Sequence, residues 1–284
     1  MCQTRTESCF FNSCDTCRNN HPSSILRTTA NISSIDENEN LTWFNWLRVN
    51  GNVHLQEINS NLSNFLDNID EQWSKILHHH YVKEQQNLFL NDLKKNSNEY
   101  DYIVVTCDFA ENYALIAQRE IQSAYYSHEQ VSIFTIHIKA GQTHSNLAII
   151  SDHLNHDSTF VYVCQKILQS YIKVQFPSVK KLYYASDGAA MHFKNKFNIL
   201  NLTFHEIDFG IPAEWIFTAT SHGKSACDGN VLALICIIIL FHSPFVVEHN
   251  LAPNNNIRVL ILLMFIRYHA TCSRISLSSF IFAF

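Results

Sequence analysis

The chain has 284 residues, of which 46% are apolar, and its formal net charge at pH 7 is −5. This size and apolar content suffice for the core of one catalytic domain with smaller N-terminal elements. The acidic balance excludes a protein coated uniformly in basic residues, but local basic patches can still bind phosphate backbones.

A cysteine-rich segment, residues 1–21, begins the chain. Cys9, Cys14 and Cys17 have the spacing C-x4-C-x2-C, and His21 follows four positions later. Thiolates and an imidazole can complete a tetrahedral Zn²⁺ shell, so one interpretation is a zinc knuckle built from these four residues. The other interpretation is a set of reduced, unliganded cysteines in a disordered terminus.

The next predicted parts are a linker and a helical region. Residues 22–41 contain Ser, Thr, Asn and acidic residues, which is typical of a linker. In residues 42–98, apolar residues recur at spacings of three and four from Ile58 to Leu77 and again from Val82 to Leu93, which predicts two packed helices. Adjacent helical residues point about 100° apart and cannot share one ion, so His78 to His80, which lie between the two periodic runs, are expected to face solvent rather than to bind a metal ion.

Residues 99–229 have the pattern of a mixed α/β domain. Tyr102 to Cys107 is a β-branched run that predicts a buried strand. Gln130 to Ile138 and Leu147 to Ile150 predict its hairpin partners, and Ser158 to Val174 has the period of an amphipathic helix. The later predicted elements are a strand at Lys181 to Ala185, a short helix at Ala189 to Phe197 and a strand at Trp215 to Ala219. The predicted order is therefore β-β-β-α-β-α-β.

Acidic residues follow the ends of three of these strands. Asp108 ends the first strand, Asp187 follows the fourth, and Asp228 follows the fifth. The element order is that of the ribonuclease-H-like arrangement, in which the first and fourth strands are neighbours, so we expect Asp108 and Asp187 to meet. Two converging carboxylates repel each other unless a cation lies between them. Since oxygen ligands favour Mg²⁺, the sequence predicts a magnesium site.

Each acidic residue also fits a role without metal. Asp108 suits a turn or the cap of a following helix, and Ser186-Asp187-Gly188 is an ordinary turn sequence. Glu111 is the alternative third ligand if Asp228 does not reach the other two. The joint order of the motifs, rather than any one of them, favours the metal site.

Four groups of residues resemble motifs of uncharacterised animal proteins whose transposase-like core derives from cut-and-paste DNA transposons. They are Asp108 to Tyr113, Gln118 to Ala124, Ser186-Asp187-Gly188 with Phe193 to Lys196, and His222-Gly223-Lys224 with Asp228-Gly229. The resemblance covers roughly Cys9 to Gly229. It implies a nuclear protein with a ribonuclease-H-like catalytic domain that cleaves and transfers DNA strands. Two Mg²⁺ ions would be held by the acidic triad Asp108, Asp187 and Asp228.

Residues near the triad in the sequence are candidates for contacts with DNA. From position alone, Lys224 would contact a phosphate, and His222 would orient the nucleophile or a phosphate oxygen. Arg119, Lys194 and Lys196 are further candidates for DNA contacts, although solvated lysines on loops need no partner. Strand transfer in related systems needs two protomers, so a homo-oligomer is expected. The alternative function is a domesticated DNA-binding or protein-interaction protein that keeps the fold without catalysis.

The tail, residues 230–284, departs from the family's pattern. The family continues with a Gly-rich, basic, helical segment, whereas this chain has an uninterrupted apolar run of 11 residues from Val231 to Phe241. That run is too short for a bilayer core, which takes about 20 residues, and Val259 to Ile266 is shorter still, so a membrane anchor is not expected. We interpret the tail as foreign to the family, which leaves the core truncated and puts its activity in doubt.

Overall fold

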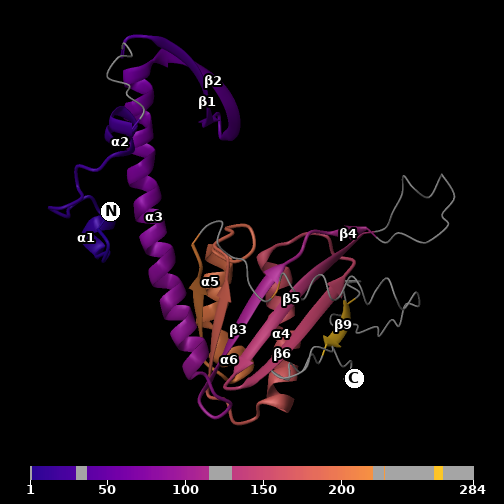
Figure 1. Ribbon diagram of the computed structural model, residues 1–284. Helices are drawn as coiled ribbons and strands as arrows, with labels where there is room; N and C mark the ends of the chain where they lie inside the picture. The colour runs from indigo at the N-terminus through magenta and orange to yellow at the C-terminus, as the bar shows by residue number, and fades with distance from the viewer. Residues whose placement is uncertain (1, 30–36, 115–129, 220–226, 228–258, 265–284) are drawn as a thin grey trace, which may run out of the picture. The chain divides into compact units, whose positions relative to one another are not determined.

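The computed structural model of the protein describes residues 2–29, 37–114, 130–219, 227 and 259–264 (Figure 1). The chain forms two compact units, Met1–Gln85 and Gln86–Phe284. Each unit is described by itself, and the long helix α3 (Leu62–Asn96) contributes residues to both.

The N-terminal unit contains two short helices, a β-hairpin and most of α3. The short helices are α1 (Glu7–Phe10) and α2 (Pro22–Thr29). The hairpin strands are β1 (Asn40–Val49) and β2 (Asn52–Asn61), which pair in antiparallel fashion along their whole length. Asn50 and Gly51 form the turn with φ of 51° and 86°, as a two-residue type I′ hairpin requires.

The structure corrects three expectations for this region. Helix α2 lies inside the segment predicted as a linker, residues 22–41, and the β1–β2 hairpin occupies the start of the predicted helical region, residues 42–98. The two packed helices are one continuous helix of 35 residues, because no Gly or Pro interrupts it. Ile58 belongs to β2, where it pairs with Trp43. The helix begins only at Leu62, so the predicted helical pattern, which started at Ile58, began too early in the chain.

The C-terminal unit is built around one mixed sheet with the strand order β8-β7-β3-β5-β6-β9. Its antiparallel part contains β3 (Tyr102–Phe109), β5 (Gln130–Ala140) and β6 (Thr143–Ser151), with the two-residue β4 (Tyr113–Ala114) paired to β5. Strands β7 (Lys181–Ser186) and β8 (Ala213–Phe217) add to β3 in parallel. The predicted adjacency of the first and fourth strands is therefore confirmed, as is a mixed α/β fold.

Part of the tail joins this sheet. Strand β9 (Val259–Met264) pairs with β6 in antiparallel fashion at the sheet's end, and it corresponds to the second apolar run predicted from the sequence. The first run, Val231 to Phe241, lies outside the described residues. Within the described part of the chain, no helix is both long and apolar enough to cross a bilayer.

Three helices follow the antiparallel strands. Helix α4 (Ser158–Gln175) begins at Asp157, whose carboxylate accepts a hydrogen bond of 2.8 Å from the backbone N–H of Phe160. Helices α5 (Lys196–Thr203) and α6 (His205–Phe209) lie between β7 and β8 in the chain. The short helix predicted at residues 189–197 is displaced, because the side chain of Asn195 caps a helix that only then begins.

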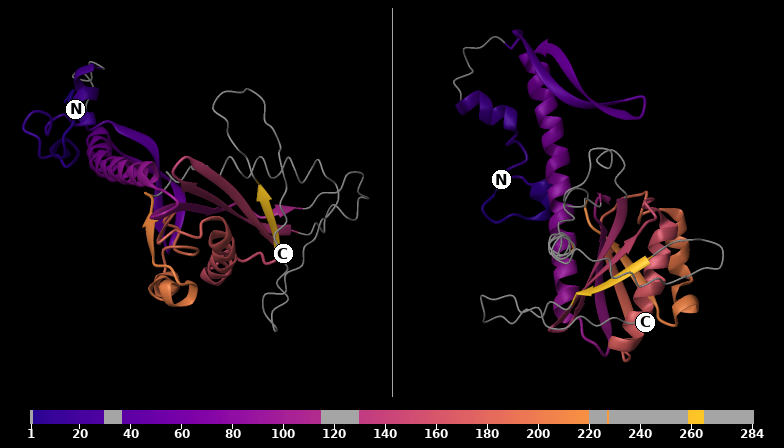
Figure 2. Two further views of the ribbon diagram at one scale, coloured as in Figure 1. Left: turned by 90° about the horizontal axis from the view of Figure 1, so that it is seen from below. Right: turned by 90° about the vertical axis from the view of Figure 1, so that its right-hand side faces the viewer.

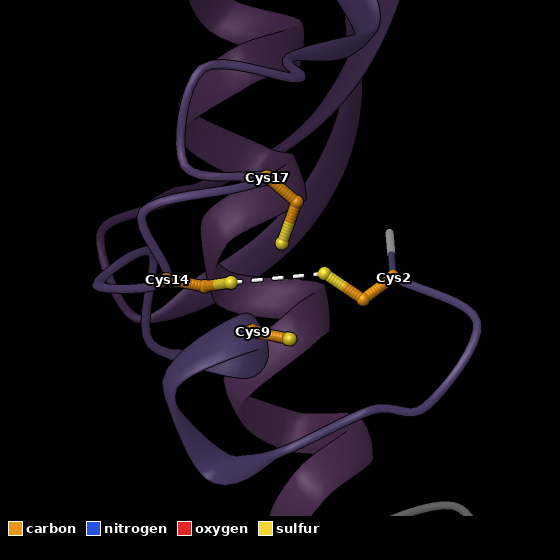
Figure 3. A group of neighbouring side chains, drawn as sticks. All are labelled: Cys2, Cys9, Cys14 and Cys17. Carbon is orange, nitrogen blue, oxygen red and sulfur yellow. Dashed lines mark hydrogen bonds between the residues drawn. The ribbon is translucent and has the colours of Figure 1, made fainter.

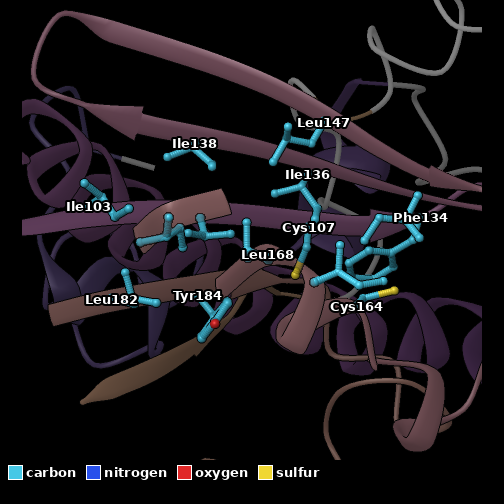
Figure 4. Close-up of a cluster of buried hydrophobic side chains, with 14 of the residues drawn as sticks. Ile103, Cys107, Phe134, Ile136, Ile138, Leu147, Cys164, Leu168, Leu182 and Tyr184 are labelled. Carbon is cyan, nitrogen blue, oxygen red and sulfur yellow. The ribbon is translucent and has the colours of Figure 1, made fainter. Parts of the chain in front are cut away.

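Both faces of the sheet are covered. On one face lies helix α4 (Figure 2), whose apolar side packs against β3 residues such as Ile103, Val105 and Cys107. Figure 4 shows Ile103 and Cys107 in this core. On the other face, Val104 packs with Leu90 from the last turns of α3. Because β-strand side chains alternate, this arrangement assigns odd and even positions of β3 to different faces.

A buried polar network fixes α6 against the first of these faces. The hydroxyl of Tyr184 lies 3.0 Å from Nε2 of His205 and accepts a hydrogen bond of 2.9 Å from Gln169. Nδ1 of His205 lies 2.7 Å from the carbonyl oxygen of Ile211, so a neutral ring that donates from Nδ1 satisfies both nitrogens. Burial lowers the pKa of His205, which favours this neutral form.

Replacing Tyr184 with Phe is expected to reduce the free energy of unfolding by about 1–2 kcal/mol, because buried groups of Gln169 and His205 lose a partner. Their own contact of 3.4 Å offsets part of the loss. Urea unfolding checks this. The matched control is Tyr100→Phe, since Tyr100 is 66% exposed and its hydroxyl should matter little. Equal urea midpoints of unfolding for the two variants would show that the network does not stabilise the fold.

Candidate functional site

The carboxyl ends of β3 and β7 bring Asp108 and Asp187 to neighbouring positions. The two strands pair in parallel, from Tyr102 with Lys181 to Thr106 with Ala185. The same offset, continued by two residues, sets Asp108 opposite Asp187, which directly follows β7. Asp108 is two residues after Thr106 on β3, and residues two apart on a strand point to the same face. Asp108 therefore lies on the sheet face that bears Thr106 and Ala185.

The carboxylates of Asp108 and Asp187 both raise the pKa of the buried Cys107 thiol. Cys107 is 3% exposed, and burial raises the pKa of its thiol well above the usual value. The negative charges of Asp108 and Asp187 both add to that rise. Both carboxylates therefore lie near the same thiol, and each aspartate is half-buried. Two acidic groups that lie close together favour a divalent cation between them.

The turn after Asp187 carries one of the predicted DNA contacts. Oδ1 of Asp187 accepts a hydrogen bond of 3.2 Å from the backbone N–H of Ala189. A Cβ atom on Gly188 would lie 3.9 Å from the side chain of Lys194, whose Nζ lies 5.8 Å from the ring centroid of Phe217. Lys194 is exposed, so a flexible positive charge borders this turn.

Other predicted residues lie farther from this turn or outside the described chain. Lys196 is exposed in the first turn of α5, with Nζ 5.0 Å from the ring centroid of Phe197. Glu111, the alternative third ligand, is exposed three residues after Asp108. The remaining predicted site residues, Arg119, His222, Lys224 and Asp228, lie outside the described residues.

One described residue precedes Asp228 directly. Cys227 is 1% exposed, and its Sγ lies 3.4 Å from the carbonyl oxygen of Thr106 and 3.8 Å from that of Thr135. Thr106 is two residues before Asp108, and the hydroxyl of Thr135 donates to the carbonyl oxygen of Asp108 at 3.1 Å. The chain therefore packs against the end of β3 immediately before the third predicted acid.

An aromatic group that sequence reasoning missed supports the end of β3. The ring of Phe109 stacks on His156 at a centroid distance of 4.3 Å and contacts His192 at 5.1 Å. Nε2 of His156 lies 2.8 Å from Oδ1 of Asn112, and burial lowers the pKa of His156. These residues come from separate segments, so no sequence spacing relates them, and they fix the position of the residue next to Asp108.

The N-terminal unit contains a second candidate site, made of four cysteines. The sulfurs of Cys2, Cys9, Cys14 and Cys17 all lie within 4.8 Å of one another and point toward a common centre (Figure 3). None of these cysteines forms a disulfide. A tetrahedral Zn²⁺ with Zn–S bonds of about 2.3 Å separates its sulfurs by roughly 3.8 Å, and the Cys2 and Cys14 sulfurs are 3.7 Å apart. The donor set therefore fits a metal ion such as zinc.

The fourth member of this group is Cys2 and not the predicted His21. The backbone carbonyl of His21 accepts hydrogen bonds from the N–H groups of Ser24 and Ile25 at 3.1 and 3.3 Å, and from the Ser24 hydroxyl at 2.7 Å. His21 thereby begins helix α2 and is no member of the cysteine group. Cys2 was overlooked because its distance along the chain from Cys9 has no familiar ligand spacing.

The thiols of the cluster differ in acidity. Hydrogen bonds from the side chain and backbone of Thr6 lower the pKa of Cys9 to about 6, and the backbone N–H of Cys17 lowers the pKa of Cys14. A hydrogen bond with Cys14 raises the pKa of Cys2 to about 12. Two of the four positions thus favour thiolates, the form that binds metal.

The cysteine segment docks on α3 through aromatic contacts. The ring of Phe10 stacks on His80 with centroids 5.8 Å apart, and Phe11 contacts His78 at 4.9 Å. Ser23 donates to both carboxylate oxygens of Asp70, from its backbone at 3.0 Å and from its hydroxyl at 2.6 Å. The three histidines lie within α3 rather than in a connection between two helices. His78 and His79 are exposed, as predicted, and His80 is half-buried.

The C-terminal unit matches a known family. A family model described as Domain of unknown function (DUF8701) matches residues 86–233, a range that begins where the C-terminal unit begins. It contains Asp108, Asp187 and Lys194 but none of the four clustered cysteines. No curated protein and no solved structure matches the chain.

Proposed function

We propose that this chain, which belongs to the family described as Domain of unknown function (DUF8701), has a ribonuclease-H-like core descended from a DNA transposase. The proposed chemistry is metal-dependent cleavage and transfer of DNA strands. The observation that carries the proposal is the register that sets Asp108 opposite Asp187 at the carboxyl ends of adjacent parallel strands. Open α/β sheets form their sites at such strand ends.

The strand order supports the same assignment. Three antiparallel strands, β3, β5 and β6, are followed in the chain by α4 and then by β7, which pairs with β3 rather than with β6. Strand β8 extends the sheet beyond β7 in parallel. This is the order expected of a ribonuclease-H-like core, and it is the order that unites the first and fourth strands.

The three acidic residues are the proposed metal ligands. Asp108, Asp187 and Asp228 would hold two Mg²⁺ ions, with Asp108 as the central ligand. The ions would supply charge stabilisation at the scissile phosphate and would lower the pKa of the attacking water or DNA 3′-hydroxyl. The choice of Asp228 as the third acid is supported by Cys227, which packs against Thr106 just before it in the chain.

Positive side chains would hold the DNA backbone. Lys194 is exposed beside the turn of Asp187, where an ammonium group can reach a phosphate as a point charge. Lys196 lies exposed at the start of α5 and would extend the contact. Arg119, His222 and Lys224 remain proposed on motif position alone, and nuclear DNA is the proposed partner.

We assign zinc to the cluster of Cys2, Cys9, Cys14 and Cys17. Four thiolates in tetrahedral reach favour Zn²⁺ over Mg²⁺, which prefers oxygen ligands. The ion would hold α1 and the following loop in one conformation, because so short a segment has few buried apolar residues of its own. Its role is thus structural, and it presents Phe10 and Phe11 to α3.

The direct test is nicking of supercoiled DNA by the purified chain. We expect cleavage in Mg²⁺ or Mn²⁺ and none in EDTA, and we expect Asp108→Asn to reduce the rate at least about 100-fold. The matched control is Asp101→Asn, because Asp101 precedes the opposite end of the same strand and is exposed. Cleavage that persists in EDTA or in Asp108→Asn would contradict the proposal. A folded chain that binds DNA without cleaving it would favour the domesticated DNA-binding alternative.

A further inference from the structure

One face of the β1–β2 hairpin exposes four large apolar side chains. The pairing sets Phe44 opposite Glu57, Trp46 opposite Leu55 and Arg48 opposite Val53, so all six residues share one face. Phe44, Trp46, Val53 and Leu55 are 61%, 66%, 52% and 53% exposed. We call these six residues the hairpin face.

The opposite face of the hairpin is covered within its own unit only near α3, whereas Leu47 and Val49 farther along that face are 36% and 39% exposed. Trp43 lies edge-on to Phe65 of α3 with ring centroids 5.3 Å apart, and its indole N–H donates to the Ser60 hydroxyl at 3.0 Å. Ile58, paired with Trp43, is half-buried. The hairpin therefore resembles a sheet with one partly packed face and one apolar face left to a partner, and a two-stranded hairpin alone is at best marginally stable.

The charges of the hairpin face are self-complementary. Its centre is the pair Trp46 and Leu55, with Phe44 and Glu57 on one side and Arg48 and Val53 on the other. Arg48 and Glu57 lie at diagonally opposite corners of this face. A two-fold axis that lies in the interface, through the centre and perpendicular to this diagonal, would bring Arg48 of one copy over Glu57 of the partner subunit, twice, and would stack the central apolar pairs. One positive and one negative charge do not suit a phosphate backbone, which requires a basic surface.

We infer that the hairpin face binds a second copy of this chain, face to face, in a two-fold dimer held by Trp46 and Leu55 and registered by Arg48 and Glu57. The inference does not depend on the proposed cleavage chemistry. Four apolar side chains form an area below the roughly 800 Å² per partner of a standard interface. The dimer is accordingly weak, with a dissociation constant on the order of 10 μM.

A charge swap tests this pairing in the full chain. Sedimentation equilibrium over a concentration series measures dimerisation of the wild type, Arg48→Glu, Glu57→Arg and the double exchange. Each single reversal sets like charges against each other across the axis and is expected to weaken the dimer at least tenfold. The double exchange restores opposite charges and should return the dissociation constant to within about threefold of the wild type.

Two further variants complete the design. Trp46→Ser removes the central anchor and should abolish the dimer, whereas Lys95→Glu reverses an exposed charge outside the hairpin and should leave it unchanged. Circular dichroism of each variant establishes that it is folded. A monomeric wild type at all concentrations, or single reversals without effect, would overturn the inference. Failure of the double exchange to restore a dimer lost in both single variants would overturn the two-fold register.

Discussion

Asp187→Asn is expected to lower metal-dependent DNA nicking by at least about 1000-fold, because one lost ligand removes several kcal/mol of charge stabilisation from the transition state. The amide keeps the oxygen that accepts from the Ala189 backbone N–H at 3.2 Å, so the turn should survive. Only the charge changes, and loss of activity can then be read as loss of metal binding.

A second readout of Asp187→Asn does not depend on catalysis. A ligand that binds only the folded state stabilises it, by about 2.7 kcal/mol at 100 times its dissociation constant. Mg²⁺ should therefore raise the melting temperature of the wild type and of Asp101→Asn, but not that of Asp187→Asn. Equal shifts in all three proteins would show that the cation binds elsewhere and would remove the basis for the acidic site.

Removing one sulfur from the N-terminal cluster should have the largest structural effect. We expect Cys9→Ser to abolish stoichiometric Zn²⁺ binding and to unfold residues 2–29, because structural zinc contributes about 10–16 kcal/mol in small zinc modules. Phe10, which is 4% exposed, would become accessible to proteases. Zinc content by mass spectrometry and limited proteolysis measure the two effects.

The same experiment distinguishes the two ligand sets. Cys2→Ser should lose zinc as Cys9→Ser does, whereas His21→Ala should keep it, because only the backbone of His21 makes the contacts that begin α2. Retention of zinc by Cys2→Ser together with its loss in His21→Ala would restore the set that the sequence predicts. Zinc retained by all three variants would rule out the cluster as a metal site.

Acid should release the zinc. The hydrogen bonds from Thr6 lower the pKa of Cys9 to about 6, so this thiol is ionised at neutral pH and becomes protonated as the pH falls through that value. Each coordinating thiol that still carries a proton, as Cys2 does with its pKa of about 12, gives it up on binding. Affinity therefore falls with falling pH, and a pH-independent affinity would contradict thiolate ligation.

Much of the C-terminal unit was predictable because the apolar residues of its strands and helices follow a regular pattern. The β-branched run that became β3 and the amphipathic run that became α4 were placed within two residues of their observed ends. The failures have local causes. The cap at Asn195 moved one helix toward the C-terminus. The Asn50–Gly51 turn is a strong hairpin signal, but the prediction for residues 42–98 used only the helical spacing of apolar residues and left this signal out.

The two candidate sites differ in how many of their residues could be predicted from the sequence. Asp108 and Asp187 follow recognisable strands, so the strand order alone could bring them together. Cys2 could not be added to Cys9, Cys14 and Cys17 by spacing, because the chain between Cys2 and Cys9 turns back through α1. The stacking of Phe109 on His156 depends wholly on tertiary structure, and no periodicity records it.

The pairing of β9 with β6 extends the sheet by one strand beyond β6. A sheet that ended at β6 would present a row of unsatisfied amide and carbonyl groups, which is a template for aggregation. Residues Val259–Met264 occupy that row from Asn146 to Ser151. A segment beyond the range that the family model matches thus provides hydrogen-bond partners for the edge strand of the sheet.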